Sequence, residues 1–195
     1  MEFFSEKTGK NFIYIDYPEK IKESFNNLFW NSEDECLYDY VNNKEFNSMI
    51  RPNQIFAVSL PFEIIDGEKQ EKVFNCVFKK LYTPFGLKTL SPDDPRYIGI
   101  YTGDRWTRDG SYHQGNIWPW LFGHFFDAMY KLNKNDESIK DKIKILLNPM
   151  EKMIMNYWDG NIPEILEGNW PYNSKGCFSQ AWSVSEILRI LIMAE

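Results

Sequence analysis

A glutamate in an irregular stretch near the end of the sequence is well suited to acid–base chemistry. Glu164 directly follows Pro163, its nearest apolar neighbours are Ile162 and Ile165, and no Lys or Arg lies close to it in the sequence. A carboxylate in such a setting is either paired for structural reasons or works as a general acid or base. The spacing alone leaves both interpretations open.

A second irregular stretch, residues 82–115, carries aromatic and hydrogen-bonding side chains just before a very apolar segment. The residues at the entrance to that segment are Tyr112, His113, Gln114 and Trp118. If the segment is a helix, its backbone donors and its dipole point to the same place. A histidine on its own is more often structural than catalytic. Together, aromatic plates and polar side chains suit a sugar ring, which has apolar C–H faces and a polar rim.

The same stretch contains a pair of acidic residues, Asp93 and Asp94, followed by Pro95. Such a pair often forms a turn through hydrogen bonds from its side chains to the backbone. Paired carboxylates also bind magnesium in helical enzymes that act on diphosphates. Because this pair lies in a Pro-rich loop and no basic cluster follows it, we reject the magnesium interpretation.

Helical periodicity predicts the elements that must position these stretches. The expected helices cover residues 18–30, 52–60, 67–81, 118–132, 137–157 and 180–193. Amphipathic helices alternate with apolar ones, and the long connections lead from an amphipathic helix to an apolar one. Long loops in compact domains are usually functional. The pattern is typical of stacked helical hairpins whose long loops gather at one end.

This pattern predicts an all-α protein that forms about half of a closed ring of helical hairpins. Short β pieces are expected near residues 36–41 and 87–90, and Pro149 should kink or split the helix over 137–157. No internal repeat or linker divides the sequence, so residues 1–195 are expected to form a single domain.

Composition narrows the classes of function. The chain has a net charge of −6 and its 22 basic residues are scattered, which argues against a nucleic-acid partner. No apolar run is long enough to span a membrane, and the N-terminus lacks the pattern of a secretory signal. Two histidines and three separated cysteines make no metal site, so we expect no metal or cofactor and a cytoplasmic protein with free thiols.

Several motifs, taken together, resemble the glycogen debranching enzyme family, in the C-terminal part of its amylo-α-1,6-glucosidase module. They are the segments Arg51–Gln54, Gly86–Tyr97, Tyr112–Gly115 with Trp118–Trp120, Ile162–Glu164 and Gln180–Ser183. They occur in the family's order and extend from about residue 18 to the last expected helix.

The resemblance implies an (α/α)6 toroid and the inverting hydrolysis of single glucosyl stubs joined α-1,6 to glycogen or a related α-glucan. Inverting glycosidases use two carboxyl groups roughly 6.5–9.5 Å apart. Glu164 matches the glutamate placed to be the family's general base. The family's general acid is an aspartate well upstream of the Arg51–Gln54 motif, and we expect this sequence to begin too late to include it. Asp104 or Asp109 could replace that acid in principle, but neither has support over a turn or sugar-binding role.

The expected glucan-binding residues come from the same motifs and from the two aromatic loops. They are Arg51, Asn53, Gln54, Asp94, Tyr97, Tyr112, His113, Gln114, Trp118, Trp170 and Gln180.

Two functions therefore remain open. One is a glucosidase that works only with a partner chain supplying the other half of the toroid, or by homo-oligomerisation. The alternative is a non-catalytic glucan-binding or vestigial protein that keeps half of a cleft. In both cases half a ring leaves apolar flanks uncovered, and monomers seldom expose such patches.

Overall fold

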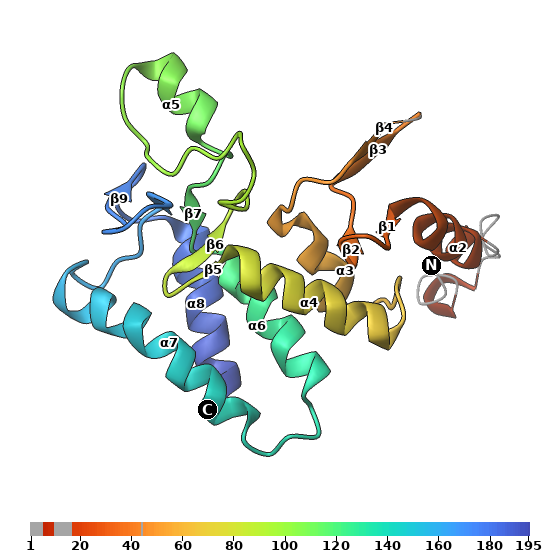
Figure 1. Ribbon diagram of the computed structural model, residues 1–195. Coiled ribbons are helices and arrows are strands. Elements are labelled where there is room, and N and C mark those ends of the chain that lie inside the picture. The colour runs from red at the N-terminus through yellow and green to blue at the C-terminus, as the bar shows by residue number, and fades with distance from the viewer. Residues whose placement is uncertain (1–5, 10–16, 44) are drawn as a thin grey trace.

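The computed structural model describes residues 6–9, 17–43 and 45–195, and helices dominate it (Figure 1). The N-terminal residues on which the secretory-signal prediction rests lie mostly outside the described part. The helices are α2 (Tyr17–Phe29), the short 3-10 helix η1 (Pro52–Ile55), α3 (Phe56–Ser59), α4 (Gly67–Leu81), α5 (Arg105–Ser111), α6 (Leu121–Leu132), α7 (Ile139–Asn156) and α8 (Ala181–Ala194).

Helix α6 lies at the centre of the helical layer. Its side chains Phe122, Phe125 and Phe126 are fully buried, and the helix contacts α3, α4, α7 and α8. Because α6 packs against neighbours on several sides, it must be apolar around most of its circumference. This confirms the prediction of a buried apolar helix here, although the helix begins three residues later than expected.

The amphipathic helices α4 and α7 bury only one face each. The side chain of Asp66 caps α4 by accepting a hydrogen bond from the backbone N–H of Lys69 at 2.8 Å. Of the two outcomes predicted at Pro149, a kink or a split, the split does not occur, because helix α7 is continuous through this residue. The missing proline N–H leaves the carbonyl of Ile145 without a helical partner. Ile145 is exposed, so water can serve that carbonyl, while Leu147 and Met150 stay anchored in the core.

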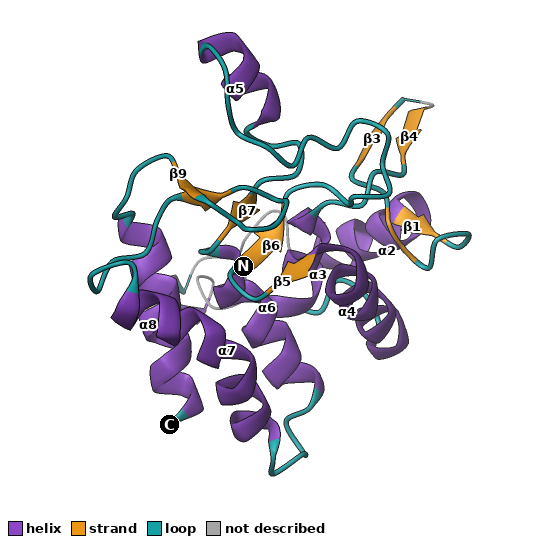
Figure 2. Cartoon of the chain, turned by 60° about the vertical axis from the view of Figure 1, so that its left-hand side comes forward, coloured by secondary structure: helices purple, strands orange, loops and turns teal. Residues whose placement is uncertain are grey.

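Short strands connect the helices at one end of the molecule. A five-stranded antiparallel sheet has the order β5 (Tyr82–Thr83), β6 (Gly86–Lys88), β7 (Ile117–Trp118), β8 (Ile165–Leu166) and β9 (Ser174–Lys175). Sequence reasoning expected only the β6 region, because strands of two residues give no alternation of apolar and polar side chains. The sheet draws the long loops together above the helices, as Figures 1 and 2 show.

The strand predicted over 36–41 is two separate pieces. Strand β2 (Cys36–Leu37) pairs with β1 (Trp30–Asn31), and β3 (Tyr40–Asn42) pairs with β4 (Glu45–Asn47). The fold is therefore mainly helical with small antiparallel sheets, which is less strict than the all-α prediction.

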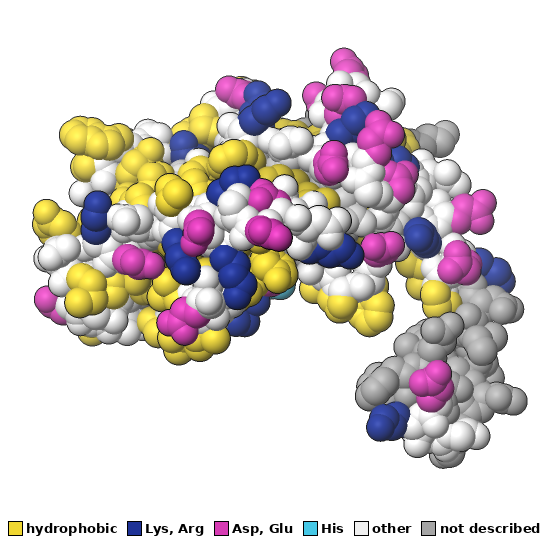
Figure 3. All heavy atoms as spheres, turned by 90° about the horizontal axis from the view of Figure 1, so that it is seen from below, with side chains coloured by type: hydrophobic (Ala, Val, Ile, Leu, Met, Phe, Trp, Pro, Cys, Tyr) yellow, Lys and Arg dark blue, Asp and Glu magenta, His cyan; other side chains and the backbone are white. Residues whose placement is uncertain are grey.

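Apolar side chains stay exposed on the helices at both ends of the chain. Tyr17, Ile21 and Leu28 of α2 and Leu188 and Ile192 of α8 are all exposed. Seen from below, hydrophobic side chains spread over much of the face on the side of α7 and α8 (Figure 3). Within the described ranges, no helix is long and apolar enough to cross a membrane.

Candidate functional site

Glu164 lies where the two long loops meet. The phenol of Tyr112 donates a hydrogen bond to its Oε1, and the backbone N–H of Cys177 donates to its Oε2 at 2.8 Å. Gly176 has a φ of 68°, and a Cβ on it would collide with the Glu164 carboxylate. The two loops thus hold this carboxylate from two sides, and the absence of a side chain at Gly176 leaves room for it.

The phenol of Tyr112 is a dependable donor. Burial, and then the hydrogen bond to Glu164, raise the pKa of Tyr112 above its usual range, so the phenol keeps its proton at neutral pH. Both side chains are only half-buried. The carboxylate is therefore oriented by donors and still within reach of solvent.

Aromatic rings form a wall beside this carboxylate. The rings of Tyr112 and Trp118 meet edge to face with centroids 4.9 Å apart, and His113 stacks on Trp118 at 5.1 Å. Trp118 itself is buried, because its backbone belongs to the central strand β7 and its ring also contacts Trp182. Of the predicted sugar-stacking residues in this loop, Tyr112 and His113 are therefore more accessible than Trp118.

Arg51 ties the start of η1 to the aromatic loop. Its guanidinium donates to the carbonyl oxygens of Thr89 and His113 and, at 2.8 Å, to Oε1 of Gln114. It also forms an ion pair with Asp39 at 3.5 Å. Two of the predicted glucan-binding residues, Arg51 and Gln114, thus bond to each other.

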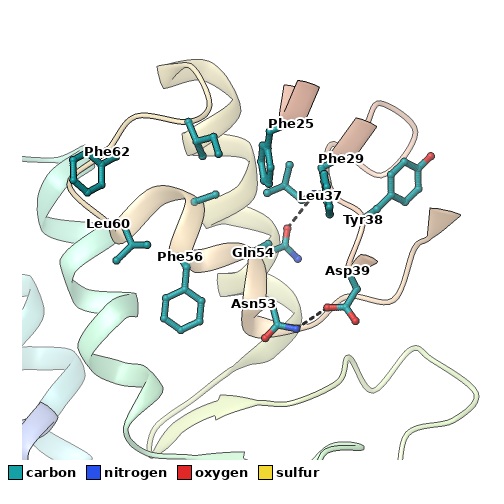
Figure 4. Close-up of a pocket in the computed structure, with 12 residues that line it drawn as sticks. Phe25, Phe29, Leu37, Tyr38, Asp39, Asn53, Gln54, Phe56, Leu60 and Phe62 are labelled. Atoms are coloured by element: carbon teal, nitrogen blue, oxygen red, sulfur yellow. Dashed lines mark hydrogen bonds between the residues drawn. The ribbon is translucent and has the colours of Figure 1, made fainter. Parts of the chain in front are cut away.

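The other two polar residues of that motif, Asn53 and Gln54, bond to the segment that holds β2 and the start of β3. Asn53 donates to Asp39 at 2.8 Å, and the buried Gln54 accepts from the backbone N–H of Leu37 at 3.3 Å. Both line an apolar cavity of about 380 Å³ together with Phe25 and other side chains (Figure 4). Glu164 is not among the residues that line this cavity, so the two regions are separate.

Asp94 and Tyr97 occupy one tight turn. The Asp94 carboxylate accepts from the backbone N–H and the guanidinium of Arg96, which lowers the pKa of Asp94. Burial raises the pKa of Tyr97 to about 12, and its phenol donates to Asn169 at 3.2 Å. The Tyr97 ring also packs so closely on Gly115 that a Cβ there would collide with it, which explains this glycine in the Tyr112–Gly115 motif.

Trp170 and Gln180 lie on the loop that carries Glu164. Trp170 is 83% exposed, so its ring is free to meet a ligand. The side chain of Gln180 accepts from the backbone N–H of Ala181 at the start of α8, and its own backbone N–H donates to Ile162 at 2.9 Å. Gln180 therefore helps to set the position of the Ile162–Glu164 segment.

Sequence reasoning missed Glu167, three residues after Glu164. Its side chain is 9% exposed and accepts from the backbone N–H of Tyr101 at 3.3 Å and from Asn173 at 2.8 Å. Lys175 forms an ion pair with it at 3.5 Å. The contact with Tyr101 joins the two long loops, and no local pattern in the sequence marks it.

Asp104 and Asp109, the two aspartates considered as the general acid, both make structural contacts on α5. Asp104 caps α5 by accepting from the backbone N–H and hydroxyl of Thr107, both at 2.8 Å, and these bonds lower its pKa. Asp109 forms an ion pair with Arg105 at 3.6 Å on the exposed side of α5. A general acid needs a raised pKa, so Asp104 has the opposite character.

The described part of the chain contains no cluster of side chains that could bind a metal ion. No group of three or more His, Cys, Asp or Glu side chains there is arranged to hold a metal ion.

Comparison with known proteins adds an independent line of evidence. Residues 1–189 match the family model described as amylo-alpha-1,6-glucosidase. The chain is also 33% identical, over 87 residues, to the glycogen debranching enzyme of Saccharomyces cerevisiae. That alignment covers 42% of this chain and 6% of the yeast protein, so the chain corresponds to a small part of that relative. Because the family model matches nearly the whole chain, including the loops that hold Tyr112 and Glu164, the chain belongs to the amylo-α-1,6-glucosidase family.

Proposed function

We propose that this chain supplies the general base and part of the glucan-binding surface for inverting hydrolysis of α-1,6-linked glucosyl stubs on glycogen or related α-glucans. The observation that carries the proposal is the Glu164 carboxylate, held by the Tyr112 phenol and the Cys177 N–H where the two loops meet. Family membership gives this carboxylate its expected role.

The geometry of Glu164 suits a general base. Each oxygen accepts one hydrogen bond, so the carboxylate is held in one orientation by its donors. A half-buried carboxylate held in this way has lone pairs left to orient a water molecule and accept its proton. Tyr112, His113 and Trp170 lie on the same two loops and would bind the sugar ring.

A second carboxyl group must protonate the leaving oxygen. Asp104 is a poor candidate because its contacts with Thr107 lower its pKa. We propose that the acid comes from the other half of an (α/α)6 toroid, carried by a segment outside this sequence or by a partner chain. The exposed apolar side chains of α2 and α8 support such a partner, because they leave both flanks of the helical array uncovered.

A cytoplasmic location is part of the proposal. All three cysteines are free, as is usual for proteins kept in a reducing compartment.

The test measures glucose release from a malto-oligosaccharide that carries one α-1,6-linked glucosyl stub. The full chain is assayed alone and with the N-terminal half of a family member's glucosidase module. We expect background rates alone and restored turnover in the mixture. In the restored enzyme, Glu164→Gln should lower kcat by about 10²–10⁴-fold, the usual contribution of a positioned general base, with little change in KM.

Glu167→Gln serves as the matched control, since it changes a nearby carboxylate in the same loop without touching Glu164. Ordinary turnover by the chain alone, lost in Asp104→Asn, would overturn the assignment of the acid to another segment. Full activity of Glu164→Gln in the restored enzyme would overturn the assignment of the base.

A non-catalytic glucan-binding protein is the second candidate. The observation in its favour concerns the two aspartates considered as the general acid. Asp104 caps α5 and Asp109 forms an ion pair with Arg105, so neither is a supported acid partner for Glu164. This alternative predicts that the chain binds malto-oligosaccharide and that no complementing half restores hydrolysis.

A further inference from the structure

Two cysteines meet where strand β2 packs against helix α4. Cys36 in β2 is buried, with an exposed fraction of 1%, and Cys76 on α4 is half-buried. An ion pair crosses the same seam, because Nζ of Lys72, one helical turn before Cys76, lies 3.0 Å from Oε1 of Glu35. The Lys72–Glu35 ion pair therefore joins the two segments independently of the two sulfur atoms.

The two sulfur atoms interact directly. Strand β2 packs against α4, and a hydrogen bond links the Cys36 and Cys76 side chains across this contact. This bond lowers the pKa of Cys76, and the positive charges of Lys79 and Lys80 act in the same direction, whereas burial and Asp34 oppose them. The same hydrogen bond, together with burial, raises the pKa of Cys36. Cys76 is thus the thiol that ionises more readily and is also the one that solvent reaches.

We propose that Cys36 and Cys76 form a reversible intramolecular disulfide, a redox modification site that links β2 to α4. The pair has the usual arrangement of such a site, in which an accessible attacking thiol lies next to a buried resolving thiol. The proposal does not depend on the glucosidase function.

The chemistry needs a two-electron oxidant, and a hydroperoxide is the class that fits. The Cys76 thiolate attacks one peroxide oxygen, the O–O bond breaks, and Cys76 becomes a sulfenic acid while hydroxide leaves and takes up a proton to give water. The Cys36 sulfur then attacks the Cys76 sulfur, the S–OH bond breaks, and the Cys36 proton leaves with the hydroxyl group as a second water. In sum, two thiols and one hydrogen peroxide give one disulfide and two waters. A dithiol reductant reverses the reaction.

The bond would stiffen the wall of the apolar cavity. Leu37, next to Cys36, lines that cavity and donates its backbone N–H to Gln54. A covalent link from β2 to α4 closes the chain between residues 36 and 76 into a loop, which restricts the unfolded state. We therefore expect the oxidised protein to unfold at a higher denaturant concentration than the reduced protein.

The experiment treats the full chain with hydrogen peroxide, blocks remaining thiols by alkylation under denaturing conditions, and maps the peptides by mass spectrometry. We expect a peptide pair joined through Cys36 and Cys76 that has lost two hydrogens, and its disappearance after reduction. Cys177→Ser is the matched control, because Cys177 is an exposed thiol on the other loop and its removal should leave the cross-link unchanged.

Two variants keep the proposal falsifiable. Cys36→Ser should accumulate a sulfenic acid at Cys76 that reacts with dimedone, and Cys76→Ser, which changes the half-buried partner, should leave Cys36 fully alkylatable. If peroxide leaves both thiols of the wild-type chain free, or converts Cys76 only to an adduct or a higher oxide without the cross-link, the proposal is wrong.

Discussion

Two polar regions of this molecule come from equally recognisable motifs but are bonded in different ways. The guanidinium of Arg51 donates hydrogen bonds to carbonyl and side-chain oxygens of the aromatic loop, and the Arg51 side chain is only 13% exposed. Glu164 has one donor on each oxygen and stays half-exposed. A motif residue can therefore matter because it holds a loop in place or because it faces the substrate, and the sequence pattern does not distinguish these roles.

The largest expected effect on stability is that of Arg51→Lys. A lysine has one ammonium group where arginine has a planar fork of donors, so it cannot reach Thr89, His113 and Gln114 at once. We expect a loss of about 2–3 kcal/mol in the free energy of unfolding, because hydrogen bonds from charged groups are worth about 1.5–3 kcal/mol. Urea unfolding measures the loss, and an unchanged midpoint would show that Arg51 does not hold the loop.

A smaller effect separates the two glutamates of the second loop. In Glu167→Gln one oxygen becomes an NH₂ group that faces a donor, either the N–H of Tyr101 or the amide of Asn173, and the ion pair with Lys175 is lost. One unsatisfied buried donor costs about 1–3 kcal/mol, so we expect a decrease of that order in the free energy of unfolding.

Glu164→Gln should cost clearly less stability than Glu167→Gln. The new amide can face Tyr112, whose hydroxyl is able to turn and accept a hydrogen bond instead of donating one. Parallel urea titrations of the two variants decide the matter. Equal losses would mean that Glu164 is as structural as Glu167 and would weaken its assignment as a base.

Acid should weaken the contact between α3 and α6. Nδ1 of His124 lies 3.1 Å from the Ser59 hydroxyl, and burial lowers the pKa of this histidine, although Glu186 and Asp127 oppose the shift. Because the folded-state pKa is below the ordinary value of about 6.5, the stabilising contribution is complete above that value and is lost as the pH falls through the folded-state pKa.

His124→Gln keeps a hydrogen-bonding group but cannot titrate in this range. The difference in unfolding free energy between the wild-type chain and this variant should therefore shrink between pH 7.5 and pH 5. Measuring the difference removes the contribution of His113, whose pKa is also lowered. A difference that does not change with pH would contradict the assignment.

The smallest effect on stability is expected for Trp170→Ala. The ring is almost fully exposed, and surface substitutions of this kind usually change stability by less than about 0.5 kcal/mol. If Trp170 stacks on a sugar ring, the affinity for malto-oligosaccharide should fall severalfold while the unfolding curve stays the same. Unchanged affinity, measured by calorimetry, would remove Trp170 from the glucan-binding surface.

Periodicity was a good guide to the helices with a large buried face. The helix predicted over 67–81 has these bounds in the structure, because Val73, Val77 and Leu81 recur at helical spacing and Asp66 caps it. Helix α5 was not predicted, since its seven residues include Gly110 and bury only Ser111. An element with almost no buried side chain leaves no apolar pattern to detect.

The site divides in the same way. The motifs singled out Glu164 and Tyr112, which the structure joins by a hydrogen bond across 52 residues of sequence. They gave no sign of Glu167, because its partners Tyr101 and Lys175 come from separate segments, an irregular loop and strand β9, that meet only after folding. The glucan contacts of the candidate residues stay predictions.

By itself the sequence determined the helical pattern, the membership in the amylo-α-1,6-glucosidase family and the identity of the candidate base. Only the tertiary structure decided which polar side chains are occupied inside the protein, as Arg51 is, and which thiols meet, as Cys36 and Cys76 do. The physical reason is the distance along the sequence between the residues that interact. Helices follow from the spacing of neighbouring side chains, whereas hydrogen bonds between loops depend on where the packed helices and the small sheet bring distant segments together.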